Sequence, residues 1–293
     1  MILVAGGTGT LGVPLVRALA ARTESVRVLT RDPRHADTLR ASGIEAVTGD
    51  VRDHATLARA CTGCTRVVSA IHGFTGGRGS NPATIDRDAN IALIRACRDA
   101  RVEHMTLISV YGAAPNHAMS LHRMKFAAEQ ALATSGLTWT VVRPTPFLET
   151  WIDLIGAEIP TRGRALVFGP GENPINFVSA GDVADVIVRG VGDERMHGQI
   201  LDVTGPQDLT FNQIATRLTV AAGLPANTRH VPLAAMRAMS LVTRRVAPTL
   251  ARQTQAAVVM NTTDMTAHHD RGHVGPTTID ELIQARTSLP ASS

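Results

Sequence analysis

The sequence predicts an α/β fold, a doubly wound parallel sheet with a smaller, mostly helical region in the C-terminal part. The first observation is an apolar stretch at residues 1–5 that runs directly into the glycine-rich residues 6–12 and then into an apolar helix at 13–20. The second is that short apolar runs alternate with helix-length segments as far as residue 205. Such alternation implies parallel strands joined by crossover helices on both faces of the sheet.

The glycine-rich turn after the first strand predicts a phosphate-binding site. Gly6 allows the tight backbone turn, Gly9 lets a pyrophosphate approach the main chain, and Gly12 lets the helix pack closely on the strand. The N-terminus of the helix adds free N–H groups and a partial positive charge. We therefore expect a dinucleotide to be held by the residues of this turn, namely Gly6, Thr8, Gly9, Thr10, Leu11 and Gly12.

The second predicted strand, at 25–30, ends at Arg31. At this position of such a fold, an acidic residue binds the ribose 2′-hydroxyl of NAD, whereas an arginine pairs with the 2′-phosphate of NADP. Arg31, supported by Arg34, therefore favours NADP(H) over NAD(H); a solvated surface cation is the competing interpretation. Asp32 and Pro33 have the pattern of an N-cap and a first helical residue, and they begin the next helix.

The third predicted strand, at 44–47, leads to Asp50. Because Asp53 can cap the following helix, Asp50 stays available to face the adenine, with Val51 beside it. An ordinary turn aspartate is the alternative interpretation of Asp50.

The fourth predicted strand, at 66–71, ends at the edge of the sheet where ligands of such folds lie. Ala70, Ile71 and His72 are therefore expected at the cofactor. His72 either contacts the nicotinamide ribose or only begins the glycine-rich loop 73–79.

Helix and strand patterns continue through the middle of the chain. Asn81 and Pro82 open a long helix that runs to about residue 101 and carries an apolar stripe. The predicted sheet is completed by strands at 105–110, 138–142 and 199–203, and a helix is predicted at 119–134.

Lys125 is the only lysine in a chain with 29 lysine and arginine residues. An ammonium is a compact donor that can also give up its proton, whereas a guanidinium stays charged and planar. Lys125 and Glu129 lie one turn apart on one helix face. We expect Lys125 to be an exposed amine in the cleft, although chance survival of one lysine is the simpler alternative.

The last third of the chain is less regular. The segment 151–174 is broken by prolines and glycines and is expected to form a lid or pocket wall. Helices are predicted at 210–222, 233–246, 250–260 and 277–285, and their methionines either hold an apolar substrate or simply pack. The group formed by His268, His269, Asp270 and His273 lacks the ligand spacing of a zinc site, so no metal is expected.

The composition excludes some classes of binding partner. The net charge of +4 is spread along the chain without a basic block or interleaved aromatic residues, which argues against nucleic acid. No apolar run is long enough to span a bilayer and the chain starts inside its first strand, so we expect a cytoplasmic protein with no membrane partner. Cys61, Cys64 and Cys97 are too few for a disulfide framework and are expected to be reduced thiols.

Several motifs together resemble the NmrA-like branch of the atypical short-chain dehydrogenase/reductases: residues 6–12, Arg31, 49–50, 108–109, Lys125 with Glu129, 135–144 and 177–184. The resemblance implies a Rossmann domain for NADP(H) over 1–150, with 175–205 returning to it, and a substrate-binding region over 151–174 and 206–293. It covers about the first two thirds of the chain. The family includes quinone and isoflavone-type reductases and also non-catalytic dinucleotide sensors.

The resemblance also implies site residues. Orthodox members use a serine and a Tyr-x-x-x-Lys unit, but Leu121 stands where the tyrosine would be. Ser109 lies at a suitable distance upstream, Tyr111 or Lys125 is left as the proton donor, and Pro144 is expected at the cofactor. For Tyr111, a loop aromatic that seals the sheet edge is the alternative.

The sequence therefore predicts an NADPH-dependent reductase, a monomer or homodimer. Its hydride acceptor is expected to be a small apolar carbonyl, enone or quinone under the segment 151–174. Two alternatives stay open, a dinucleotide sensor without turnover and a sugar-nucleotide epimerase or dehydratase.

Overall fold

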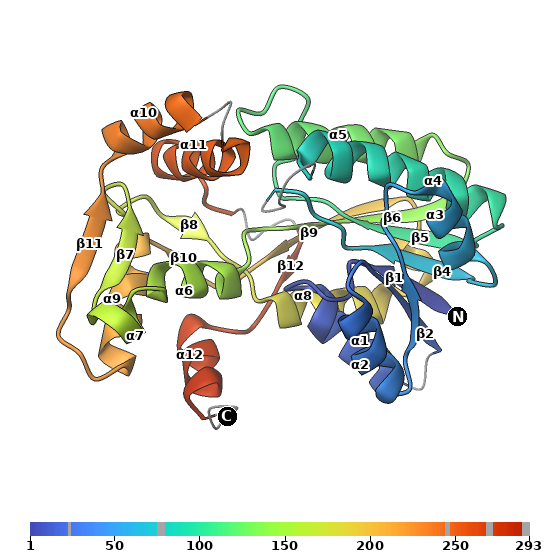
Figure 1. Cartoon of the computed structure of the whole chain (residues 1–293), viewed down its shortest axis with the longest axis horizontal. Helices are drawn as coiled ribbons and strands as arrows, with labels where there is room; N and C mark the ends of the chain where they lie inside the picture. Colours follow the sequence, from blue (N-terminus) through green and yellow to red (C-terminus); the bar gives the residue numbers. More distant parts are fainter. Residues whose placement is uncertain (23–24, 75–79, 244–246, 268–271, 289–293) are drawn as a thin grey trace. The chain divides into compact units, whose positions relative to one another are not determined.

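The computed structural model describes residues 1–22, 25–74, 80–243, 247–267 and 272–288 (Figure 1). The chain divides into two compact units. Unit 1 contains residues 1–144 and 183–202, and unit 2 contains residues 145–182 and 203–293. Each unit has its own apolar core and is described by itself.

The central sheet confirms the predicted fold class. Its eight strands lie in the order β12-β9-β6-β5-β4-β1-β2-β3, and the pairings from β3 through β6 are all parallel. Every strand predicted from the sequence is present, as β1 Ile2–Ala5, β2 Val26–Thr30, β3 Glu45–Thr48, β4 Arg66–Ser69, β5 His104–Ile108, β6 Thr138–Pro144 and β9 Gln199–Thr204. The order of connection reverses between β1 and β4, and in such sheets ligands bind at the carboxyl ends of the strands on either side of that reversal.

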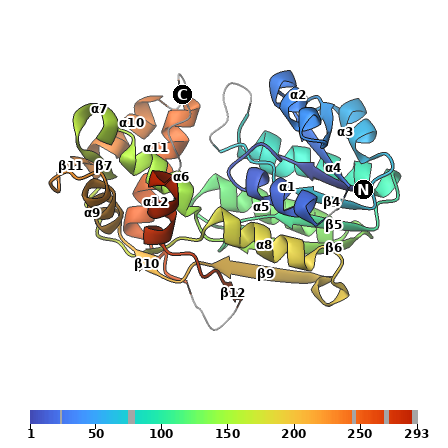
Figure 2. The ribbon, with the colours of Figure 1, turned by 90° about the horizontal axis from the view of Figure 1, so that it is seen from below.

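Helices cover both faces of the sheet of unit 1 (Figures 1 and 2). One face carries α1 (Gly12–Ala21), α2 (Pro33–Ala41) and α8 (Ala180–Gly190), and the other carries α3 (His54–Cys61), α4 (Asn90–Asp99) and α5 (Ser120–Ala133). The predicted caps are confirmed: the Asp32 carboxylate accepts a hydrogen bond from the Arg34 amide, and the Asp53 carboxylate accepts from the amides of Ala55 and Thr56.

The long helix predicted over 81–101 begins as a π-helix, η1 (Pro82–Ala89), and continues as α4. Asn81 caps it as expected, with Thr84 completing a reciprocal capping box. The face of this helix that is fully inaccessible contains two polar residues beside two apolar ones, Asp86, Asn90, Leu93 and Cys97. The negative charge of a carboxylate without solvent contact must be stabilised by a cation or by hydrogen-bond donors of the protein.

Unit 2 is more regular than the sequence predicts. Where a lid was expected, the chain forms α6 (Leu148–Gly156), α7 (Ile159–Arg162) and β7 (Ala165–Phe168). β7 pairs in parallel with β11 (Thr228–Val231), and β8 (Ile175–Asn176) pairs antiparallel with β10 (Asp208–Leu209). The remaining elements are η2 (Glu194–Met196), which belongs to unit 1, and α9 (Phe211–Ala221), α10 (Leu233–Thr243), α11 (Pro248–Thr262), β12 (His273–Val274) and α12 (Ile279–Thr287).

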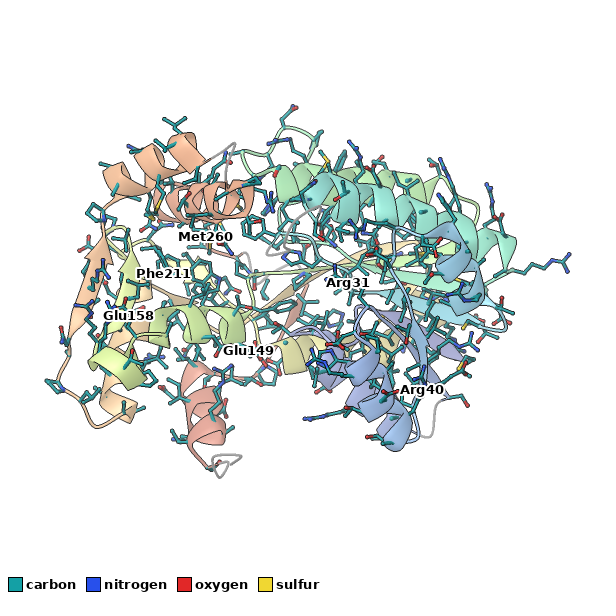
Figure 3. The ribbon with its side chains drawn as sticks, in the orientation of Figure 1. Arg31, Arg40, Glu149, Glu158, Phe211 and Met260 are labelled. Atoms are coloured by element: carbon teal, nitrogen blue, oxygen red, sulfur yellow. The ribbon has the colours of Figure 1, made fainter. Side chains whose placement is uncertain are left out.

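An aromatic cluster forms the centre of unit 2. The Trp151 ring stacks on the Phe211 ring with centroids 4.7 Å apart, and Phe177 packs against both. Phe211 is labelled in Figure 3. Met260 lies in the same core, so this methionine packs within the unit. The segment 151–174 is not irregular as expected, because its apolar residues are buried against α9 and α11; its role as a lid or pocket wall stays a prediction.

The motif at 177–184 holds the start of α8. The Glu149 carboxylate accepts hydrogen bonds from the Ser179 hydroxyl and the Ala180 amide, at 2.9 Å each (Figure 3). Asp182 accepts from the amide and hydroxyl of Thr277. These contacts fix the first residues of α8, 180–182, which belong to unit 2.

No helix among the described residues has both the length and the apolar character needed to cross a membrane.

Replacing Gly12 tests the packing of the turn on the first strand. A Cβ at position 12 would collide with the Gly6 carbonyl oxygen and would lie 2.5 Å from Gly7 backbone atoms. We expect Gly12→Ala to lower the free energy of unfolding by about 3 kcal/mol, because backbone cannot move aside as a side chain can. Urea unfolding followed by circular dichroism measures this difference.

Gly9→Ala is the matched control. A Cβ at position 9 meets only the Gly6 oxygen, at an ordinary 3.5 Å. Its free energy of unfolding is expected to stay within about 0.5 kcal/mol of the wild type. Equal losses in the two variants would contradict the packing role of Gly12.

Candidate functional site

The turn between β1 and α1 leaves its amide groups open. Gly6 has φ +90°, a conformation that favours glycine, and the Gly9 amide donates back to the Gly6 carbonyl at 3.2 Å. Leu11 provides no side-chain cap for α1. The amides of Thr10, Leu11 and Gly12 have no hydrogen-bond partner among the residues that the structure describes.

This geometry fits an anionic diphosphate. Thr8, Gly9 and Thr10 are exposed, and the space beside Gly9 is open. Unbonded N–H groups at a helix N-terminus attract negative charge, and a missing Cβ lets a phosphate approach the backbone. The residues expected to hold the pyrophosphate therefore lie together, with the donors still available.

The cationic group after β2 is Arg31. Its side chain is exposed, and no ion pair holds it within the described part of the chain (Figure 3). Arg34, expected to support it, is instead paired with Asp32 through both carboxylate oxygens, at 3.3 and 3.1 Å. Arg31 is thus the side chain at the end of β2 that is available to an anionic ligand.

Asp50 is not free, contrary to the expectation. Both its carboxylate oxygens accept from the Arg52 guanidinium, at 2.9 and 2.6 Å. The hydrogen bonds from the Arg52 side chain outweigh the partial burial of the carboxyl, so the pKa of Asp50 is lowered. A local pair two residues apart occupies the group that was expected to face the adenine, while Val51 beside it is half-buried.

The segment that follows β4 lies directly against the glycine turn. A Cβ on Gly6 would come within 2.6 Å of the Ala70 carbonyl oxygen and 3.0 Å of the Ile71 amide nitrogen. The next residue, His72, has 43% of its side chain exposed. The structure therefore brings the predicted residues Ala70, Ile71 and His72 beside the turn.

Lys125 is buried, so its prediction as an exposed amine is wrong. Its side chain is 3% exposed, and Nζ donates to the carbonyl oxygens of Ile71 and Ile108, at 2.9 Å each. The ammonium also lies 3.2 Å from Oδ1 of Asp86. These carbonyls follow or end β4 and β5, so Lys125 fastens the carboxyl ends of two neighbouring strands.

Asp86 is the site residue that the sequence analysis missed. Its side chain is fully buried, Oδ2 accepts from the Gly73 amide at 3.0 Å, and Oδ1 faces both Lys125 and Nδ1 of His72, the latter at 3.5 Å. Burial acts to raise the pKa of Asp86, but the Lys125 ammonium, His72 and the Gly73 amide lower it below its ordinary value. The usable signal was a carboxylate in the buried stripe that also contains Asn90, Leu93 and Cys97.

The remaining predicted groups surround the end of β5. The Ser109 hydroxyl is buried and has no hydrogen-bond partner among the described residues, while the Ser109 amide donates to Val142 at 2.7 Å. The Tyr111 amide donates to the Pro144 carbonyl at 2.9 Å, so these two predicted residues are neighbours. Leu121, which stands at the position of the orthodox tyrosine, is buried.

Glu129 does not pair with Lys125 on its own helix. It forms a bidentate ion pair with Arg143, through contacts of 2.9 and 2.5 Å. The hydrogen bonds that Arg143 donates to Glu129 raise the pKa of Arg143, against the effect of its partial burial. Two buried acids, Asp86 and Glu129, thus neutralise Lys125 and Arg143.

Other predicted groups take no part in this site. Within the described ranges no group of His, Cys, Asp and Glu side chains is arranged to hold a metal, and His268, His269 and Asp270 lie outside the described residues. The loop residues 75–79 also lie outside them. Cys61, Cys64 and Cys97 are free buried thiols.

The chain is similar in sequence to known proteins. The sequence profile of the NAD(P)H-binding family matches residues 6–194. An NAD(P)H azoreductase from Xenophilus azovorans is 31% identical over 245 residues, which cover 83% of this chain and 80% of the relative. The photosystem II assembly factor Ycf39 from Synechocystis sp. is 30% identical over 248 residues, 83% of this chain and 74% of the relative.

A solved structure shares the fold. An NADPH-dependent quinone oxidoreductase from Escherichia coli, complexed with NADPH, superposes with a TM-score of 0.78 at 21% identity and covers 98% of this chain and 100% of its own. The family profile and the 31% identical relative confirm the predicted superfamily. The chain belongs to the NAD(P)H-binding family, within the NAD(P)-binding Rossmann superfamily.

Proposed function

We propose that the protein is an NADP(H)-dependent reductase that delivers hydride to a small apolar carbonyl, enone or quinone. The observation that carries the proposal is the glycine turn, where unbonded amides at the start of α1 lie beside the exposed Arg31 end of β2. The names of an azoreductase relative and of a quinone oxidoreductase with the same fold support a reductase.

Different residues bind different parts of the cofactor in this proposal. The amides of Thr10 to Gly12 bind the diphosphate, and the guanidinium of Arg31 pairs with the 2′-phosphate, which NAD lacks. The backbone at Ala70 and Ile71 borders the same turn. When bound, the reduced nicotinamide supplies the hydride, and the protein supplies orientation and electrostatics.

Lys125 acts in this proposal as a positioning residue. Its contacts with Ile71, Ile108 and Asp86 occupy the ammonium, which leaves it little capacity to donate to a ligand. By holding the carboxyl ends of β4 and β5 together, it fixes the positions of Ser109 and of the segment 70–73. This replaces the catalytic role expected from the sequence.

A second candidate function is dinucleotide binding without turnover. The Ycf39 relative, an assembly factor, and the absence of the orthodox tyrosine at Leu121 both favour it. The glycine turn is equally suited to either function. Turnover therefore has to be measured.

Steady-state oxidation of NADPH with a panel of benzoquinones, naphthoquinones, cyclic enones and azo dyes tests the proposal. We expect saturable turnover with at least one quinone and release of the corresponding hydroquinone. Isothermal titration with NADPH is run in parallel. Tight NADPH binding without reduction of any acceptor would replace the reductase by the binding function.

Arg31→Ala tests the choice of cofactor. Loss of a charge-assisted pair with the 2′-phosphate is expected to weaken NADPH binding about 10- to 100-fold and to leave NADH binding almost unchanged. Arg40→Ala is the matched control. Arg40 is an arginine of α2 (labelled in Figure 3), but its guanidinium already binds Asp37 and the Ala46 carbonyl, so its loss is expected to leave NADPH binding unchanged. Equal weakening for both dinucleotides would contradict the role given to Arg31.

Lys125→Met tests the positioning role. Removing the ammonium leaves Asp86 charged and buried, so we expect the free energy of unfolding to fall by about 3–5 kcal/mol. The double variant Lys125→Met with Asp86→Asn is expected to recover part of that loss, since no uncompensated charge remains. A Lys125→Met protein as stable as the wild type in urea would show that the pair does not hold the strand ends.

A further inference from the structure

His72 occupies a defined place at the sheet edge. Its neighbour Ile71 accepts a hydrogen bond from Lys125, and its other neighbour Gly73 donates one to Asp86. On the opposite side, the backbone of 70–71 touches the Gly6 turn. The main chain around His72 is therefore fixed from both directions, while its ring stays 43% exposed.

The buried carboxylate of Asp86 orients this ring. Oδ1 of Asp86 faces Nδ1 of His72 at 3.5 Å and the Lys125 ammonium at 3.2 Å. This carboxylate oxygen can accept a hydrogen bond from a protonated Nδ1. Nε2 is then the ring nitrogen that is directed away from Asp86. The charged groups that face His72 are Asp86 and, behind it, Lys125; Phe74 lies beside the ring with centroids 6.0 Å apart.

Of the other candidate donors, Lys125 and Ser109 are less suitable than His72, and the half-buried Tyr111 stays the alternative. The Lys125 ammonium is buried and engaged, and the Ser109 hydroxyl is 2% exposed. Leu121 has no proton to give. A donor that serves turnover must also regain its proton, and the exposed ring of His72 can take one from solvent.

We propose that His72, oriented by Asp86, is the catalytic acid that protonates the acceptor. This inference rests on the proposed reductase function. The acceptor gains a hydride, with its two electrons, from the reduced dinucleotide, and one proton from the His72 imidazolium. The Nε2–H bond breaks, its electron pair stays on nitrogen, and an O–H bond forms on the quinone oxygen, giving hydroquinone, oxidised dinucleotide and neutral imidazole.

The test compares two acceptors that differ in their need for a proton. A quinone needs hydride and a proton, whereas a cationic triarylmethane dye becomes its neutral colourless form on gaining hydride alone. General acid catalysis contributes about 10²- to 10⁴-fold, so we expect His72→Gln to lower kcat for quinone at least about 100-fold. With the cationic dye its rate is expected to fall by no more than about threefold.

His54→Gln is the matched control, because His54 is an exposed histidine at the start of α3. Both acceptors are expected to react with it at wild-type rates. NADPH affinity by calorimetry is expected to be the same in the wild type and His54→Gln, and it is also measured for His72→Gln so that kcat is compared at saturating NADPH. A readout independent of turnover is the ¹⁵N spectrum of the His72 ring, where we expect a protonated Nδ1 that Asp86→Asn shifts toward the other tautomer.

The outcomes separate the two proposals. If neither acceptor is reduced by the wild type, the reductase function fails. If the wild type reduces both and His72→Gln loses them equally, or loses neither, His72 is not the acid. A ring whose Nδ1 carries no proton in the wild type would also overturn the orientation by Asp86.

Discussion

The ion pair between Lys125 and Asp86 fixes the edge of the sheet on which the candidate site is built. The two residues come from different helices and meet beneath the ends of β4 and β5, where Nζ also binds the carbonyls of Ile71 and Ile108. Burying either charge alone would cost several kcal/mol, so each residue depends on the other. The backbone that borders the glycine turn is set by this pair and by the Gly73 contact of Asp86.

Sequence reasoning succeeded where the signal is local. The glycine turn, the caps at Asp32 and Asp53 and the strands of unit 1 each follow from neighbouring residues, and all are present. Arg31 was expected from its place after β2, and the structure leaves it exposed. Its pairing with a 2′-phosphate is a prediction still to be measured.

It failed where a residue's partner lies far along the chain or is a competing neighbour. The burial of Lys125 could not be inferred, because the neutralising carboxylate belongs to a helix nearly forty residues earlier, Asp86. Short strands such as β7 were missed because their hydrogen-bond partner, β11, comes some sixty residues later. Asp50 was expected to face the adenine or to be an ordinary turn aspartate, and Arg34 to support Arg31. Each forms a local ion pair instead, Asp50 with Arg52 and Arg34 with Asp32.

The burial of the sole lysine has a practical consequence. Every other basic side chain of the Lys and Arg class is a guanidinium, so the folded surface offers no ammonium side chain to an amine-directed reagent. Acylation of that side chain, which is 3% exposed, requires an opening motion that exposes Nζ. The rate at which such a reagent modifies Lys125 therefore measures how often this region opens. The natural chain carries this single reporter side chain without any substitution.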